Sequence, residues 1–431
     1  MKTLLMGCLT VLLMAVNTCS GQEDEGLRMV ILSDTHLMAP ELLVEDGEAM
    51  ERYIAYDRKM LRESPQLMEE AVEAVLAERP QYVLVVGDLT KDGETRSHLM
   101  LRDRYLSRLR AAGIGVLVVP GNHDVDNPHA VEFRGSETRR VSTPGAEEFA
   151  AIYEDYGYGQ AIARDTASLS YVVELTDDVR LLCLDACRYE ENSYEENTCV
   201  TGGRLKDATL DFIREQARAA KSNGCRLLAM MHHGIVEHWT WQSRAMSDYL
   251  VAKWKKRAKL LRKLGVEVVF TGHFHANDIS ERGGLYDIET GSLVSYPSPY
   301  RLAELRGDTL RVETRYLQGT ALDMQLPEGM TLRDYSLGYA KEGICSVVSS
   351  MFPENCPQSV RLEACSLLGE AYAAHLAGNE QMPAGAEEEI DAVAKQLRPY
   401  SWKLAYIFKH ITRYLWTDLE PADEEIEIVL D

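Results

Sequence analysis

The sequence has few basic residues relative to acidic ones, no closely paired cysteines and no apolar run near its N-terminus long enough to cross a membrane. Its 431 residues include 46 Lys and Arg against 68 Asp and Glu, which gives a formal charge of −22. An acidic surface repels a phosphate backbone, so we expect no groove for duplex nucleic acid. A small phosphate substrate is compatible with this charge, because bound metal ions can make a site locally positive.

The N-terminal apolar run, Thr3–Val16, is too short to span a membrane and reads as a targeting signal. It is followed by Cys19 among small and polar residues, and then by an acidic stretch. This arrangement resembles a bacterial lipoprotein signal, and the acidic stretch resembles the surface-export signals of Bacteroidetes lipoproteins. We therefore expect a signal peptide over residues 1–18, a tether over 19–27 and a protein of the bacterial cell envelope that contacts the membrane only through a lipid anchor at Cys19. Lipidation at Cys8, or an ordinary secretory signal with a free periplasmic product, are the alternatives.

The chain has nine cysteines but no CxxC pair, which argues against a zinc knuckle or a thioredoxin-type site. Removing the two in the signal region leaves seven, an odd number that excludes full pairing within the chain. In an oxidising envelope, Cys187–Cys199 and Cys345–Cys356 could each close a short loop. The alternative for Cys183 and Cys225, which lie in apolar runs, is that they are buried thiols.

Short apolar runs alternate with amphipathic stretches from about residue 28 to 317. Ser64 and Pro65 mark the start of one helix, and the apolar residues that follow recur at helical spacing. This alternation predicts an α/β domain with largely parallel inner strands. The expected strands are 27–32, 82–86, 115–119, 171–175, 179–184, 226–231, 266–270, 285–290 and 309–316, and further helical stripes lie over 210–220 and 250–264.

The strand signals fade after residue 317, and residues 318–431 read as a helical C-terminal region of roughly 100 residues packed on the α/β domain. Helices are expected over 332–342, 360–377, 386–397 and 402–415. The acidic end of the chain, Glu420–Asp431, is expected to be partly mobile.

Polar residues gather where the predicted strands end. The strands run into Ser-Asp-Thr-His at 33–36, Gly-Asp at 87–88, Gly-Asn-His-Asp at 121–124, His-His-Gly at 232–234 and Gly-His-Phe-His at 272–275. Ligands of open α/β sheets bind outside the carboxyl ends of the strands, so these loops should converge on one crevice. Carboxylate, imidazole and amide oxygen together suit divalent ions of borderline hardness, namely Mn, Fe, Zn or Ni.

This ordered set of blocks resembles the calcineurin-like metallophosphoesterases over about residues 28–317. The resemblance implies a four-layer α/β/β/α sandwich with a two-metal site. It also implies a role for each matching residue: Asp34, His36 and His275 hold the first ion, Asp88 bridges, and Asn122, His232 and His273 hold the second ion.

The remaining polar residues of the blocks have other expected roles. His123 would face the substrate as a catalytic residue. Asp124, the other catalytic candidate, would either hydrogen-bond His123 or cap the next element. We favour His232 over its neighbour His233 as the ligand, because it lies nearer the strand end. His98 and His129 are expected at the surface, and His238, Asn277 and Asp278 are expected to be structural or to support the ligands.

The resemblance implies hydrolysis of phosphoric esters by a hydroxide that bridges two divalent ions. Lys91 stands where purple acid phosphatases have a tyrosine, and the Gly-His-Phe-His block is absent from protein serine/threonine phosphatases. The helical region is too short for the substrate domain of 5′-nucleotidases. The remaining resemblance is to bacterial class III cyclic-nucleotide phosphodiesterase-like proteins, which implies a small phosphodiester substrate. The alternatives are an envelope phosphomonoesterase, a sphingomyelinase-like lipid phosphodiesterase, or a non-catalytic surface lipoprotein that binds metal or phosphate.

Overall fold

The computed structural model describes residues 26–55, 57–319 and 326–431. The predicted signal peptide and the anchor at Cys19 lie outside the described residues, as does nearly all of the tether. Within the described part of the chain, no helix combines the length and apolar composition that a membrane span requires.

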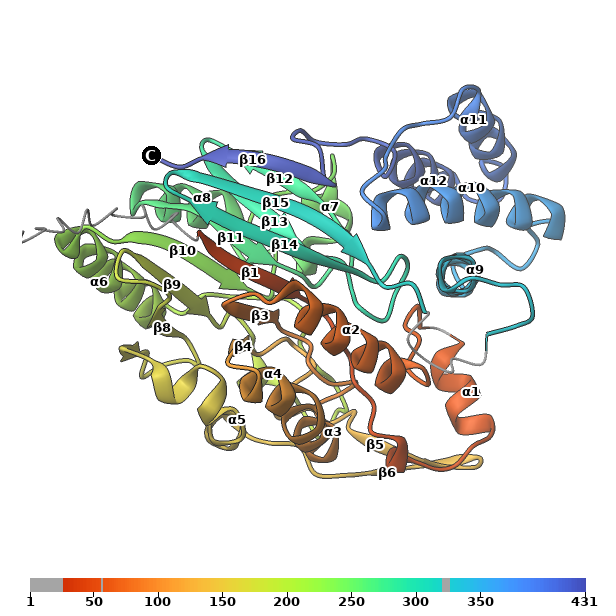
Figure 1. The fold of residues 1–431 in the computed structure, drawn as a ribbon. Helices are drawn as coiled ribbons and strands as arrows, with labels where there is room; N and C mark the ends of the chain where they lie inside the picture. The colour runs from red at the N-terminus through yellow and green to blue at the C-terminus, as the bar shows by residue number, and fades with distance from the viewer. Residues whose placement is uncertain (1–25, 56, 320–325) are drawn as a thin grey trace, which may run out of the picture.

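Two mixed β-sheets form the centre of the molecule (Figure 1). The six-stranded sheet has the order β16–β15–β14–β1–β3–β4, and β1 (Leu27–Leu32), β3 (Tyr82–Val86) and β4 (Gly115–Val119) are parallel. The antiparallel strands β14 (Pro299–Arg306) and β15 (Thr309–Tyr316) extend it beyond β1. The predicted parallel inner strands are therefore present, and the antiparallel pair covers one edge.

The seven-stranded sheet has the order β12–β13–β11–β10–β9–β8–β7. Its inner strands β9 (Val179–Leu184), β10 (Arg226–Met231), β11 (Val266–Thr271) and β13 (Leu285–Glu289) are parallel. The outer strands β7 (Ala163–Arg164), β8 (Tyr171–Glu174) and β12 (Ile279–Arg282) are antiparallel to their neighbours. A small third sheet contains β2 (Leu43–Glu45), β5 (Val131–Arg134) and β6 (Glu137–Arg140).

Apolar side chains from both large sheets pack into one core, as Val85 and Met230 illustrate. Helices α2 (Ser64–Glu78) and α4 (Ser107–Ala111) contribute to the same core from the six-stranded side. Helices α6 (Asp207–Asn223) and α8 (Trp254–Lys263) pack through a second apolar cluster against the seven-stranded sheet. The predicted four-layer α/β/β/α sandwich is confirmed.

The helical C-terminal region is also confirmed, and it lies at one end of the sheets (Figure 1). It contains α9 (Leu332–Ser349), α10 (Gln358–Leu376), α11 (Ala386–Leu397) and α12 (Trp402–Tyr414), which share an apolar core with loop residues such as Trp239 and Phe274. The remaining short helices of the chain before the helical region are α1 (Glu48–Ile54), α3 (Thr95–Met100), α5 (Ala146–Ile152) and α7 (Gln242–Ala245).

The acidic tail departs from the prediction. Instead of a mobile end, residues Glu425–Val429 form strand β16, which pairs antiparallel with β15 and buries Ile428. The alternation of apolar and polar residues in β16 is short, and its partner β15 is more than 100 residues away in the sequence. Local periodicity therefore did not predict this strand.

The two predicted disulfides are also absent. All seven cysteines in the described part of the chain are free. The Cys187 thiol is buried and donates to the Pro120 carbonyl, while the Cys199 thiol lies 2.8 Å from Asn127 Oδ1. Cys183 is buried as the alternative expected, whereas Cys225 is only partly buried. Cys187 and Cys199 therefore contact Pro120 and Asn127 instead of each other.

Candidate metal centre

The predicted ligand loops meet at one edge of the sheets. They follow β1, β3 and β4 in the first sheet and β10 and β11 in the second. Backbone hydrogen bonds join neighbouring loops, for example from Asp34 N to the Gly87 carbonyl at 3.1 Å and from His36 N to the Asp88 carbonyl at 2.9 Å. The convergence expected from the sheet topology is therefore observed.

The first ligand group contains Asp34, His36, Asp88 and His275, all buried. The Nε2 atoms of His36 and His275 lie 3.3 Å apart. Asp34 Oδ1 lies 3.3 Å from His275 Nε2, and Asp88 Oδ2 lies 3.6 Å from His36 Nε2. Four potential donor atoms thus surround one point, as the sequence predicted for the first ion.

The second group contains Asp88, His232 and His273. His232 Nε2 lies 3.3 Å from Asp88 Oδ2 and 3.2 Å from Asn122 Oδ1, so the predicted amide ligand also faces this point. Asp88 belongs to both groups, which is the geometry that a bridging carboxylate requires. The neighbouring His233 instead directs Nε2 to the Thr201 carbonyl at 2.9 Å, in agreement with our preference for His232.

The chemistry of these residues fits two divalent cations. Asp34 Oδ1 is buried and has no hydrogen-bond partner among the described residues. Burial, followed by the charge of Lys59, holds the pKa of His36 well below its usual value and keeps it in the neutral form that binds metal. The site also attracts positive charge, because Asp88 and Asp34 raise the pKa of His232 to about 10 although burial opposes this.

The ligand loops hold an unusual backbone conformation. Asp34, His36, Asp88, His273 and His275 all have positive φ, between 37° and 80°. Such angles are costly for residues with a side chain and concentrate at functional sites. The residue before Asp88 must be a glycine for steric reasons. Gly87 has φ 81°, and a Cβ there would overlap the His232 ring. A Cβ on Gly121 would likewise overlap the Asp88 carboxylate.

His123 lies beside the two ligand groups without joining either. Its side chain is 26% exposed, and its Nε2 is 3.9 Å from Asp88 Oδ2. Its Nδ1 lies 2.9 Å from Asp92 Oδ1, a residue that our sequence reasoning did not assign to the site. Asp92 is held by the buried Lys91 and by the Tyr53 hydroxyl at 2.7 Å. Although burial opposes it, the Asp88 and Asp92 carboxylates raise the pKa of His123.

We predict that Asp92→Asn lowers turnover about 10- to 100-fold, the effect typical of a residue that orients a functional histidine. Metal content should be unchanged, because Asp92 contacts neither ligand group. The loss should be larger in kcat than in KM, and larger for alkyl than for nitrophenyl esters, because the change acts through His123. Comparing both ester types at full metal occupancy checks this, and an equal loss on all esters would contradict it.

Asp124 has different partners from those that a catalytic role predicts. Its carboxylate is fully buried and accepts hydrogen bonds from the amides of Gly121, Leu89 and Thr90 at 2.8–3.0 Å. It therefore ties the loop after β3 to the loop after β4, and Asp92 takes the place beside the His123 ring. The geometry favours a structural role for Asp124.

His98 is buried rather than exposed, contrary to expectation. Its Nδ1 lies 2.9 Å from the Tyr153 hydroxyl, and its Nε2 lies 3.0 Å from the Asp124 carbonyl. Burial lowers its pKa to about 4. His129, the other histidine expected at the surface, is half-buried and directs Nε2 to the Asn197 carbonyl.

The lowered pKa of His98 predicts that the free energy of unfolding depends on pH. Between pH 6.5 and 4 the unfolded chain takes up a proton on this residue while the folded chain does not. The free energy of unfolding should therefore fall by up to about 3 kcal/mol as the pH drops through this range. His98→Gln should remove this part of the slope in denaturant titrations. Parallel pH curves for the two proteins would contradict the assignment.

A pocket of about 160 Å³ opens over the ligand groups. Besides the predicted residues, it is lined by Asp57, Arg58 and Lys59 from the loop after α1, by Thr201 and by Tyr249. Lys59 Nζ lies 3.4 Å from Asp57 Oδ2 and adds positive charge close to the site. No motif marks this loop in the sequence, and only the folded chain brings it to the metal centre.

Comparisons with known proteins assign the chain to a family. The family model described as calcineurin-like phosphoesterase matches residues 27–277. Similar solved structures include a dimetal phosphatase from Danio rerio, with 17% identity, a TM-score of 0.48 and coverage of 68% of this chain and 97% of that chain. A Staphylococcus aureus protein described as a 5′-nucleotidase has 12% identity, a TM-score of 0.40 and coverage of 68% and 54%. GAP50, the anchor in the inner membrane complex of Plasmodium, has 10% identity, a TM-score of 0.39 and coverage of 77% and 98%. The search of curated proteins gave no match.

Proposed function

Since the chain belongs to the calcineurin-like phosphoesterase family of metal-dependent phosphoester hydrolases, we propose that it hydrolyses phosphodiesters, with nucleotide-like or other small diesters as the substrate class. One observation supports this most: Asp88 is shared by two ligand groups, and the half-buried His123 stands beside them. In this proposal His123 is the acid that protonates the leaving ester oxygen.

Each group of the chain has a defined task in this proposal. When bound, two divalent ions would supply Lewis-acid polarisation of the phosphoryl oxygens and activation of a water molecule. His123 donates a proton from Nε2 to the leaving ester oxygen, since its Nδ1 is already engaged by Asp92. Lys59 and Arg58, on the pocket wall, attract the anionic phosphoryl group.

The test compares a diester with a monoester. Protein loaded with Mn²⁺ should hydrolyse bis-p-nitrophenyl phosphate with a higher kcat/KM than p-nitrophenyl phosphate. A preference for the monoester would reject the diesterase assignment in favour of a phosphomonoesterase. Absence of turnover on both, with metal bound, would support a protein that only binds metal or phosphate.

We also propose that the mature protein is attached to the cell envelope through lipid on Cys19, because a short apolar run ends near this residue and an acidic stretch follows it. Two acyl anchors would give stable membrane attachment. Cys19→Ala should move the protein from the membrane fraction to the soluble fraction. Cys8→Ala should leave it in the membrane fraction. A Cys19→Ala protein that still sediments with membranes would contradict the anchor.

A further inference from the structure

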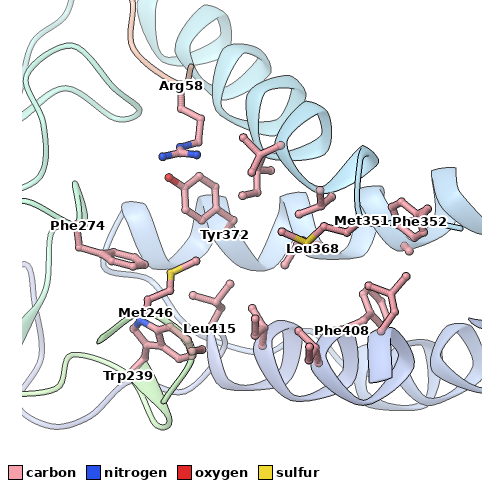
Figure 2. A pocket seen from close by; sticks show the side chains of 18 of the residues that line it. Arg58, Trp239, Met246, Phe274, Met351, Phe352, Leu368, Tyr372, Phe408 and Leu415 are labelled. Atoms are coloured by element: carbon pink, nitrogen blue, oxygen red, sulfur yellow. The ribbon is translucent and has the colours of Figure 1, made fainter. Parts of the chain in front are cut away.

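A second, larger cavity of about 410 Å³ lies between the helical region and the metal centre (Figure 2). Helices α9, α10 and α12 form most of its wall, and almost every lining side chain is apolar. Figure 2 shows Trp239 and Phe274 at one end and Phe352 and Phe408 at the other. The size and lining are typical of a pocket for a largely apolar ligand.

The cavity adjoins the metal-site pocket, with which it shares three lining residues. Arg58, Tyr249 and Phe274 line both. Phe274 stands between the ligands His273 and His275 in the sequence, so one short loop supplies metal ligands to one pocket and an apolar wall to the other. The Arg58 guanidinium lies 5.9 Å from the Tyr372 ring centroid at this junction, where it can face an anionic group.

The far end of the cavity reaches the molecular surface. Two of its lining residues, Met351 and Ile407, are 58% and 43% exposed. Exposed apolar side chains around an apolar opening are typical of sites that receive hydrophobic ligands. The cavity therefore has an apolar opening at one end and lies beside the polar metal-site pocket at the other.

We propose that the cavity holds the hydrocarbon chain of an amphiphilic phosphodiester, whose phosphate lies at the metal centre and whose negative charge faces Arg58. This proposal rests on the proposed function and names its substrate class as a lipid-like phosphodiester. In the reaction, the oxygen of water bonds to phosphorus, one P–O ester bond breaks, and the alcohol leaves with a proton. No electrons are exchanged.

The test uses alkyl p-nitrophenyl phosphates with chains from methyl to octyl, kept below micelle-forming concentrations. Each buried methylene should raise kcat/KM about fourfold, so the octyl ester should exceed the methyl ester by about 10⁴-fold when all of its added methylenes are buried. A flat response to chain length would overturn the cavity proposal and leave the diesterase proposal standing. Absence of turnover on every ester would instead reject the proposed function.

Two substitutions on helix α10 provide a matched pair. Leu368→Trp fills the cavity and should abolish the chain-length dependence while retaining turnover of the methyl ester. Leu362→Trp makes the same change at a side chain that is 59% exposed and outside the cavity, and it should keep the dependence. Equal losses on methyl and octyl esters in Leu368→Trp would overturn the proposal. If Leu368→Trp does not fold, the dependence of kcat/KM on chain length in the unmodified protein still tests the cavity proposal.

An independent observation concerns a third cluster of buried ligand-type residues. Asp278, His375 and Glu380 offer donor atoms within 4.8 Å of one another. Asp278 precedes β12, and His375 and Glu380 lie at the end of α10 and just after it. Asp423, which precedes β16, lies close by, because its carboxylate accepts the amide of Ile279, the residue after Asp278. The cluster thus joins the helical region and the final strand to the sandwich.

Each of the three carboxylates has one bonded oxygen and one unpartnered oxygen. Asp278 Oδ1 contacts His238 Nδ1, Glu380 Oε1 lies 2.7 Å from His375 Nδ1, and Asp423 Oδ1 accepts the Ile279 amide at 2.6 Å. The other oxygen of each is buried and has no hydrogen-bond partner among the described residues, and that of Asp278 lies 3.8 Å from His375 Nδ1.

Among the described residues, no positive side chain neutralises all of these carboxylates. The buried Arg301 donates to the backbone carbonyls of Asp423 and Asp278 and not to their carboxylates. His238 contacts Asp278, but it also faces Asp287 and Glu289. Burial and mutual repulsion consequently raise the pKa of Glu380 and of Asp423 to about 10.

We infer that Asp278, His375, Glu380 and Asp423 bind a divalent cation that fastens the helical region to the sandwich. Three carboxylates and one imidazole suit Mn²⁺ or Zn²⁺. Full-length protein dialysed against Mn²⁺ should bind three ions per chain, and Glu380→Gln should bind two while keeping turnover of bis-p-nitrophenyl phosphate.

An anomalous difference map of the Mn²⁺-loaded unmodified protein provides the second measurement. A peak among the four side chains is expected. Absence of a peak there, in crystals that show manganese at Asp88, would overturn the inference and would mean that the carboxyls share protons instead. The map decides the matter if Glu380→Gln does not fold.

Discussion

Replacing Asp88 by Asn is expected to abolish turnover and to lower the metal content by at least one ion per chain. Asp88 Oδ2 lies 3.6 Å from His36 Nε2 and 3.3 Å from His232 Nε2, and Asp88 is the residue common to both ligand groups. Removal of a single oxyanion-hole donor costs about 10²–10³-fold in rate, and a bridging carboxylate should contribute at least as much. Activity assays and metal analysis of the purified variant check this.

Asp185→Asn is the matched control for this prediction. Asp185 is also a buried aspartate directly after a strand, but its carboxylate contacts Leu169, Cys187 and Tyr189 instead of the ligand groups. It should retain the metal. Full activity of Asp88→Asn, with its metal content unchanged, would reject the bridging role.

The second large effect is expected for His123→Ala. Loss of a general acid typically costs about 10²–10⁴-fold in rate. The loss should be greatest for alkyl or nucleoside esters and smaller for nitrophenyl esters, because nitrophenolate leaves without a proton. Metal content should not change, since His123 belongs to neither ligand group.

His129→Ala serves as the control, because His129 lies in the following loop and bonds the Asn197 carbonyl. It should retain near-normal activity on both ester types. Metal loss in His123→Ala, or a loss of equal size on all esters, would show that His123 is not the acid.

The metal ligands could be predicted from the sequence because each of them follows a strand whose apolar run is easily recognised. Asp34, Asp88 and His232 come within two residues of such runs, and parallel strands bring their carboxyl ends to one edge. The positive φ angles of Asp34 and Asp88 follow from the same sharp exits from the strands. The strand ends recognised in the sequence and the parallel order of the strands therefore both predict the position of these ligands.

The residues that sequence reasoning missed depend on contacts that are distant in the chain. Asp92 reaches His123 across 31 positions, and Arg58 meets Tyr372 only once α10 packs on the sandwich. His98 is buried by Tyr153 and by the loop of Asp124, although its own helix has no apolar stripe. The strand β16 likewise depends on a partner far away in the chain. Such contacts leave no periodic signal in the sequence.

An anomalous difference map of Mn²⁺-loaded crystals around Asp88 tests whether the metal centre is dinuclear and bridged by this residue. We predict two peaks that both contact the Asp88 carboxylate, one within coordination distance of Asp34, His36 and His275, and the other of Asn122, His232 and His273. A single peak, or two peaks that do not share Asp88, would contradict the account.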